Sequence, residues 1–328
     1  MENSNKVLIL YHKEDNDGVW SGALFVNHFI HDLNYDKGNV IYHGMNYGDM
    51  NSITKKQIKE WHLKYEYLIL TDISMKADLM DYAHMLFENK FIWVDHHKPI
   101  IKECERYKAS SEWSGERGID RSAILLTWKY LYDQFDIEYN QKYGNIPRLL
   151  VMLSSWDSFT YEQNGFSLMD CKAVNEGINS LFKLDIDAVR EYLHNGNIDS
   201  ILDDAFKSGN FINNYQQTQN QNLIKEWGDC GWTVGDNRKA CAIFLQGPTN
   251  SLIFESLKGT DIKSGIVFKY RPEKHDWVVS LYNINDKDES FHCGEYMKKY
   301  WKGGGHAGAA GGNMNQAWFR CCLRNKSL

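Results

Sequence analysis

Three short apolar runs in this sequence each lead into acidic residues, and this pattern constrains the fold more than any other feature. The runs lie at residues 7–11, 67–70 and 91–94. The residues that follow them are Asp15 and Asp17, then Asp72, and then Asp95, His96 and His97. Runs of this length and composition are typical of buried parallel strands. The carboxyl ends of such strands meet at one edge of an open α/β sheet, where ligands bind, so we expect these acids to converge.

The convergence of the acids points to bound metal ions. Carboxylates that lie close together repel one another, so either some of them take up protons or cations lie among them. The interleaved histidines favour cations, because carboxylate oxygens with imidazole nitrogens suit Mn²⁺, Fe²⁺ or Co²⁺, with Zn²⁺ as a further alternative. The sequence therefore predicts a site for two divalent metal ions.

The first two groups of acids each have a local structural alternative. Asp15 and Asp17, with Gly18 allowing a tight turn, could instead form an Asx-type turn that caps a helix. Asp72 could cap a helix that begins near Met75. The repetition of acids after all of the apolar runs favours the metal site over these alternatives.

Two adjacent histidines follow Asp95 at the end of the third run. At a strand end, one imidazole can reach a metal while the other hydrogen-bonds a phosphoryl oxygen, so we expect His96 and His97 to divide these roles. A later acid, Asp157, follows an apolar run at residues 148–155 that fits either a helix or a strand. A helix-capping role for Asp157 is equally compatible with its local sequence.

A glycine cluster at residues 303–312 is the compositionally biased part of the chain. It begins with Gly303, Gly304, Gly305 and His306. Consecutive glycines let backbone N–H groups approach an anion closely and form a phosphate-binding nest. The alternative is a flexible linker, but the embedded histidine and the small-residue run that follows favour the phosphate site.

Composition indicates a globular protein. The chain has 328 residues with 43% hydrophobic and 24% charged, enough for two domains and a buried core. The seven cysteines are odd in number and form no C-x-x-C pair, so we expect free thiols. The polar start of the chain predicts no secretory signal, and no stretch is apolar enough to span a membrane, so we expect a cytoplasmic location. A net charge of −6 argues against binding long nucleic acid by charge alone.

The order of strand-like and helix-like segments predicts an α/β fold with a parallel sheet in the N-terminal domain. We expect a metal-binding catalytic domain at residues 1–195, a linker helix region at 196–227 and a smaller α+β domain at 228–328. Expected helices lie at 19–33, 76–88, 122–135, 201–227 and 295–300. Further expected strands lie at 39–42, 239–245, 265–270 and 277–282.

These motifs, in this order, resemble the DHH phosphoesterase superfamily, specifically members with a DHHA1 C-terminal domain. The resemblance rests on D-x-D-G, a lone Asp on a later strand, D-H-H, a further Asp and G-G-G-H. It extends over nearly the whole chain, from His12 to Gly312, and looks closest to the oligoribonuclease branch of the NrnA and NrnB kind. The family places its first His four residues before the first Asp, whereas His12 stands three before Asp15.

The resemblance implies a role for each matching residue. One metal ion would be held by Asp15, Asp72 and His12, and the other by Asp17, Asp72, His96 and Asp157. Asp95 would orient a ligating histidine, and His97 would contact the scissile phosphate. Gly303, Gly304, Gly305 and His306 would bind the terminal phosphate or sugar of a nucleotide.

The activity implied by the resemblance is a Mn²⁺-dependent phosphodiesterase with a two-metal mechanism, with Mg²⁺ or Co²⁺ as alternative ions. Its substrate would be a short RNA oligonucleotide, and its product a 5′-mononucleotide. Cyclic mono- or dinucleotides and adenosine bisphosphate are alternatives within the same chemistry. A catalytically silent nucleotide-binding sensor is the alternative from another class. The sequence leaves a homodimer open.

Overall fold

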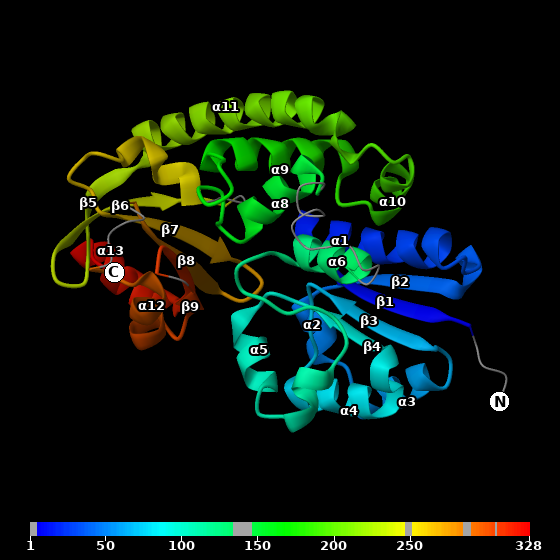
Figure 1. The fold of residues 1–328 in the computed structure, drawn as a ribbon. Helices are drawn as coiled ribbons and strands as arrows, with labels where there is room; N and C mark the ends of the chain where they lie inside the picture. The colour runs from blue at the N-terminus through cyan, green and yellow to red at the C-terminus, as the bar shows by residue number, and fades with distance from the viewer. Residues whose placement is uncertain (1–4, 134–145, 247–250, 285–289, 306) are drawn as a thin grey trace. The chain divides into compact units, whose positions relative to one another are not determined.

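The first unit of the structure is built on a four-stranded parallel sheet with the strand order β2-β1-β3-β4 (Figure 1). Its strands are β1 (Val7–His12), β2 (Val40–Met45), β3 (Tyr67–Thr71) and β4 (Phe91–Val94). The three apolar runs are therefore strands, as predicted, and the strand expected at 39–42 is β2.

The computed structural model describes residues 5–133, 146–246, 251–284, 290–305 and 307–328. It divides into two units, Met1–Asn213 and Asn214–Leu328. The long helix α11 (Leu202–Trp227) contributes residues to both units and matches the helix expected at 201–227. The last two residues of the helix expected at 122–135 lie outside the described residues.

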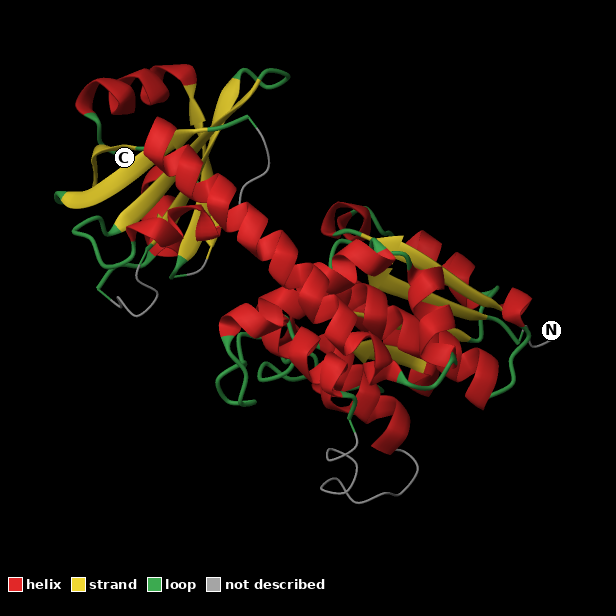
Figure 2. Ribbon diagram, turned by 90° about the horizontal axis from the view of Figure 1, so that it is seen from above, coloured by secondary structure: helices red, strands yellow, loops and turns green. Residues whose placement is uncertain are grey.

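Helices cover both faces of the parallel sheet, because successive side chains of a strand point to opposite faces. Val7 and Ile9 of β1 belong to the core shared with α1, α6, α8, α9 and α10, whereas Leu8 and Leu10 belong to the core shared with α2 to α5. Figure 1 shows α1 and α6 on one side of the strands and α3 and α4 on the other, and in Figure 2 helices lie over the strands. The helices are α1 (Asn16–Asn27), α2 (Tyr47–Asn51), α3 (Lys55–His62), α4 (Ala77–Phe87), α5 (Lys98–Cys104), α6 (Ala123–Asp133), α8 (Arg148–Asp157), α9 (Leu168–Phe182) and α10 (Ile186–His194).

The order of the strands places a topological switch point at β1. Helix α1 leads from β1 to β2 on one face, and α2 and α3 lead from β2 to β3 on the other face. Because β1 lies between β2 and β3, the connections diverge at its carboxyl end. In open α/β sheets such a point opens a crevice that binds ligands. Four of the predicted metal ligands follow these strands at this edge: Asp15 and Asp17 after β1, Asp72 after β3 and His96 after β4.

The second unit contains a six-stranded mixed sheet with the order β5-β6-β7-β8-β10-β9. Its elements are β5 (Asp229–Val234), β6 (Arg238–Phe244), β7 (Ser264–Arg271), β8 (Asp276–Asn283), α12 (Cys293–Trp301), β9 (Gly304–Gly305), β10 (Ala309–Asn315) and α13 (Gln316–Asn325). Met297 of α12 and Phe319 of α13 pack on one face of the sheet, and Ile224 of α11 packs on the other. The α+β class expected for this part of the chain is confirmed.

Candidate metal centre

Asp15 and Asp17 stand at the junction between β1 and α1. Asp15 caps the helix, since its Oδ1 accepts a hydrogen bond from the Gly18 N–H at 2.9 Å. The capping alternative is therefore correct for Asp15, and it leaves the second carboxylate oxygen facing His12. The reason for glycine at position 18 differs from the expected tight turn: a Cβ there would lie 2.1 Å from the His12 carbonyl oxygen.

Asp17 is buried and held by the start of helix α6. Its Oδ1 accepts hydrogen bonds from the Ser122 hydroxyl at 2.5 Å and the Ile124 N–H at 2.8 Å, and its Oδ2 accepts one from the Ala123 N–H at 2.7 Å. The first N–H groups of a helix have no partner within the helix, and an acid there is further favoured by the helix dipole. Asp17 thus serves α6 as well as the site.

Asp72 follows β3 with a left-handed backbone, at φ 56°. It is not the helix cap considered above, because α4 begins at Ala77 and its N-cap is Lys76. The side chain is buried, and its Oδ1 has no hydrogen-bond partner among the described residues. Left-handed geometry is uncommon outside glycine and marks positions where surrounding structure fixes the backbone. A buried carboxylate oxygen without a partner is costly unless a ligand completes it.

His96 is the point at which the acids meet. Its Nε2 lies 3.1 Å from Oδ2 of Asp157, 3.3 Å from Oδ1 of Asp72 and 3.6 Å from Oδ2 of Asp17. These three acids come from helix α8, the end of β3 and the first turn of α1. The structure therefore brings together the four residues expected to hold the second ion.

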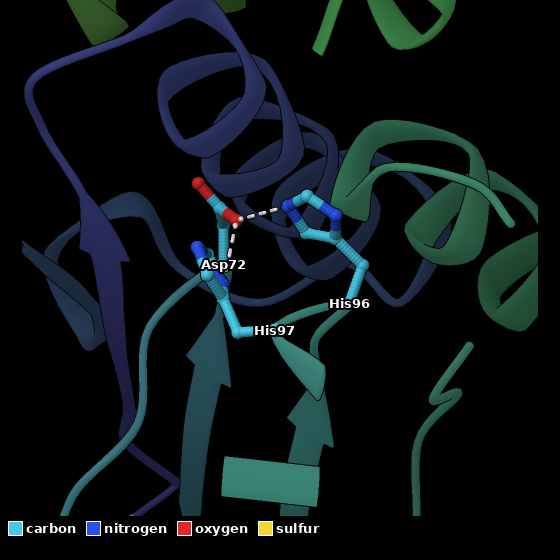
Figure 3. A group of neighbouring side chains, drawn as sticks. All are labelled: Asp72, His96 and His97. Atoms are coloured by element: carbon cyan, nitrogen blue, oxygen red, sulfur yellow. Dashed lines mark ion pairs between the residues drawn. The ribbon is translucent and has the colours of Figure 1, made fainter. Parts of the chain in front are cut away.

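Asp95 and His97 form a separate pair beside this cluster. The Nδ1 of His97 donates to Oδ1 of Asp95 at 2.7 Å, and the Trp93 indole N–H donates to Oδ2 at 3.1 Å. The histidine that Asp95 orients is thus His97, which was expected to contact the phosphate, and not a histidine expected to bind a metal. Figure 3 shows both imidazoles directed towards the carboxylate of Asp72, with His97 Nδ1 3.7 Å from its Oδ1.

His12 is the last residue of β1 and is also buried at the site. Its Nε2 lies 3.4 Å from Oδ2 of Asp15, and its Nδ1 has no hydrogen-bond partner among the described residues. His12 stands three residues before Asp15 rather than four, and the fold nevertheless brings the two side chains together.

The electrostatics of the cluster are those of carboxylates that need a counter-charge. Burial, together with the charges of Asp17 and Asp15, raises the pKa of Asp157 to about 8. Burial and the same neighbours raise the pKa of Asp72 well above its ordinary value, and burial and Asp17 raise the pKa of Asp15. Burial lowers the pKa of His97, but the hydrogen bond to Asp95 and the charges of Asp95, Asp157 and Asp17 together outweigh it, so the pKa is raised.

Divalent ions fit this arrangement. Two groups have ligand atoms within 4.8 Å of one another, namely Asp72, His96 and His97, and Asp17, His96 and Asp157. The unpartnered oxygen of Asp72 and the raised carboxyl pKa values are features that a bound cation would compensate.

Sequence reasoning missed Tyr47, which begins helix α2 directly after β2. Its hydroxyl lies 2.9 Å from Nε2 of His97, and its ring centroid lies 5.2 Å from that of His12. Burial and the charges of the site acids, Asp72 first among them, raise its pKa. The available signal was the capping box of Asn46 and Asp49, which indicates a short helix at the same edge of the sheet.

The glycines predicted to bind phosphate lie in the second unit. Gly304 and Gly305 form strand β9, which pairs with Gly311 and Ala310 of β10. A Cβ on Gly303 would lie 2.0 Å from the Gly311 carbonyl oxygen, so packing alone requires glycine there. His306 lies outside the described residues, and the phosphate-binding role of this segment stays a prediction.

No helix among the described residues is long and apolar enough to cross a membrane. No protein-family model and no curated protein matched the sequence.

Solved structures do match the fold. The PF0399 DHH domain, from a protein described as a member of a family of ribosomal proteins, is 12% identical with a TM-score of 0.55, over 98% of this chain and 86% of that chain. The pGpG-specific phosphodiesterase PggH of Vibrio cholerae is 13% identical with a TM-score of 0.51, over 98% of this chain and 97% of that chain. The expected assignment to the oligoribonuclease branch stays a prediction, but the chain has the fold of the DHH-domain proteins, as its motifs predicted.

Proposed function

We propose that this protein is a metal-dependent phosphodiesterase that hydrolyses short RNA oligonucleotides to 5′-mononucleotides. The observation that carries the proposal is the position of His96 Nε2 within 3.1 to 3.6 Å of three carboxylates from separate elements. A structural role does not account for this cluster, because it leaves Oδ1 of the buried Asp72 without a hydrogen bond. Strongly raised carboxyl pKa values at a sheet edge are typical of functional sites.

Two divalent ions, Mn²⁺ with Mg²⁺ or Co²⁺ as alternatives, would be held at this edge. One would be bound by His12, Asp15 and Asp72, and the other by Asp17, Asp72, His96 and Asp157. Ions bound in this way supply Lewis acidity and a nucleophilic hydroxide for in-line attack on phosphorus.

The chain's own residues prepare the site for that reaction. Helix α6 fixes Asp17 before any ligand binds, because both carboxylate oxygens accept hydrogen bonds from Ser122, Ala123 and Ile124. Asp95 fixes the imidazole of His97 by a hydrogen bond. This imidazole lies beside the cluster around His96, with its Nδ1 3.7 Å from Oδ1 of Asp72. A preorganised imidazole can stabilise charge that develops on a phosphoryl oxygen.

Two observations support a short substrate. A phosphodiesterase with the same fold is named as specific for pGpG. The net charge of −6 disfavours association with long polyanions, whose binding depends on many cationic contacts. We propose that Gly303, Gly304, Gly305 and His306 bind the nucleotide end of such a substrate. The cytoplasmic location stays a prediction, and the sequence leaves a homodimer open.

A product-mass assay with added Mn²⁺ tests the proposal. The substrates are di- to pentaribonucleotides, pGpG, cyclic mono- and dinucleotides, adenosine bisphosphate and pyrophosphate, and the expected product is a 5′-mononucleotide from the linear oligonucleotides. Turnover should be lost in chelator and in Asp72→Asn. Exclusive hydrolysis of a cyclic nucleotide or the bisphosphate would replace the proposed substrate. Nucleotide binding without any hydrolysis would instead support a catalytically silent sensor.

A further inference from the structure

The imidazole of His97 is held from both sides. Its Nδ1 lies 2.7 Å from Oδ1 of Asp95, and its Nε2 lies 2.9 Å from the hydroxyl of Tyr47. Asp95 is fully buried and accepts two further N–H groups, from the Trp93 indole at 3.1 Å and the His97 backbone at 3.0 Å. Both ring nitrogens of His97 therefore have hydrogen-bond partners in this structure.

The donors and acceptors among these groups can be assigned. A carboxylate oxygen accepts, so Nδ1 of His97 donates to Asp95. When this imidazole is neutral, Nε2 is an acceptor, and the Tyr47 hydroxyl donates to it. The Tyr47 hydroxyl can rotate about its C–O bond, because a hydroxyl hydrogen is not fixed by the ring. It can therefore change its partner without moving a heavy atom.

The rest of Tyr47 is well fixed but open to solvent. Asn46 and Asp49 form a reciprocal capping box, with hydrogen bonds of 2.9 and 3.1 Å, that sets the backbone at the start of α2. The ring packs against His12 and His97, with centroid distances of 5.2 and 5.8 Å. The residue nevertheless keeps 42% of its surface exposed. A fixed, partly exposed tyrosine therefore stands beside the proposed ion ligands.

We propose that Tyr47 is a substrate-contacting residue, whose hydroxyl leaves Nε2 of His97 and donates to a phosphoryl oxygen when a nucleotide binds. This inference rests on the proposed function for the identity of the ligand. An anionic oxygen is a stronger acceptor than a neutral imidazole nitrogen, so the exchange is favourable. It also frees Nε2 of His97, which the resting structure keeps occupied.

Binding of adenosine 5′-monophosphate tests the role of Tyr47 without turnover. Calorimetry with Mn²⁺ would compare wild type, Tyr47→Phe and Tyr42→Phe. Tyr42 is the matched control, because it lies on the adjacent strand β2 and its hydroxyl instead donates to Asp187 at 2.6 Å. We expect Tyr47→Phe to bind the nucleotide about tenfold more weakly, as for loss of one hydrogen bond to a charged group. Tyr42→Phe should bind as wild type does.

Imidazole nitrogen NMR provides a second, independent readout. In the free protein Tyr47→Phe should shift the Nε2 resonance of His97 and leave that of Nδ1, which a general loss of structure would not do. In wild type, the nucleotide should produce the same Nε2 shift. Equal nucleotide affinity of wild type and Tyr47→Phe, or no measurable affinity of wild type, would overturn the inference. Since neither measurement needs hydrolysis, both decide on Tyr47 even if no substrate in the assay panel is cleaved.

Discussion

The Nε2 atom of His96 lies 3.1 Å from Oδ2 of Asp157, which joins the end of β4 to the last residue of α8. A helix C-terminus carries negative partial charge and disfavours an anion. Burial, Asp17 and Asp15 disfavour it further, and the pKa of Asp157 reaches about 8. Near neutral pH this carboxyl therefore holds a proton that a cation would replace.

Metal binding should release protons at neutral pH. A divalent ion favours ionised carboxylates, so Mn²⁺ must displace the proton from Asp157, whose pKa is about 8. Calorimetric titrations at pH 7, in buffers of different ionisation enthalpy, should give binding heats that depend on the buffer. The dependence should weaken above pH 8 and in Asp157→Asn. Heats that are the same in every buffer would contradict the raised pKa values.

The metal-free protein should lose stability as the pH rises. The pKa of Asp157 is about 8 in the folded protein, compared with an ordinary value of 3.8. The folded state thus binds more protons between these values, and the resulting stability is complete below about pH 4 and lost as the pH rises through 8. One pKa unit corresponds to about 1.4 kcal/mol, so the expected loss is several kcal/mol. Thermal unfolding in chelator, with Asp157→Asn as the comparison, measures it; a parallel pH dependence in both proteins would reject this assignment.

Asp72→Asn should separate metal binding from folding. Asparagine tolerates the left-handed backbone of this position, and the substitution removes a buried negative charge, so the metal-free variant should be at least as stable as wild type at pH 8. Because Asp72 is the proposed ligand of both ions, it should contribute more to metal affinity than Asp15 does. Metal affinity should therefore fall by more than the ~10- to 100-fold expected for an outer partner. Metal analysis showing a smaller loss than in Asp15→Asn would remove the bridging role.

Asp17→Ala should destabilise the protein even without metal. It removes the acceptor for Ser122 and leaves the buried N–H groups of Ala123 and Ile124 unpaired. Loss of a helix cap with charged hydrogen bonds should cost about 2 to 3 kcal/mol. Ser122→Ala is the matched control and should cost only about 1 kcal/mol. Denaturant unfolding in chelator measures both, and equal stability of Asp17→Ala and wild type would refute the capping role.

His306→Ala should weaken productive nucleotide binding and leave the metal content unchanged, because its proposed contact is with the nucleotide end. The expected change is a raised KM with little effect on kcat. Steady-state kinetics on a dinucleotide, with metal analysis of the same preparation, would show it. A loss of bound metal would instead place His306 in the metal centre.

The acids could be located from the sequence because parallel strands bring their carboxyl ends to one edge. This argument places Asp17, Asp72 and His96 correctly without any side-chain detail. It could not decide whether residues 148–155 form a helix or a strand, since a short apolar run fits both. It also could not show that Asp95 pairs with His97 rather than His96, because adjacent side chains at a strand end can turn either way.

Two of the elements that the sequence analysis missed, β10 and α2, have weak local signals. Strand β10 (Ala309–Asn315) consists largely of small residues and lacks apolar alternation, so its place is set by pairing with β8. Helix α2 has five residues, too short for a helical repeat to be recognised, and it carries Tyr47. The formation of β10 and of α2 therefore depends on tertiary contacts rather than on local conformational preference.

Because Asp17 is hydrogen-bonded to helix α6, the protein should stay folded when no metal ion is bound. Small metal-dependent domains unfold when their ion is removed, because the ion supplies the folding free energy. Here hydrogen bonds within the protein already fix one proposed ligand, and a large core of buried side chains surrounds α1 and α6. Removal of the ions should leave a folded protein whose site can be refilled, so that the supply of metal acts as a reversible control of its activity.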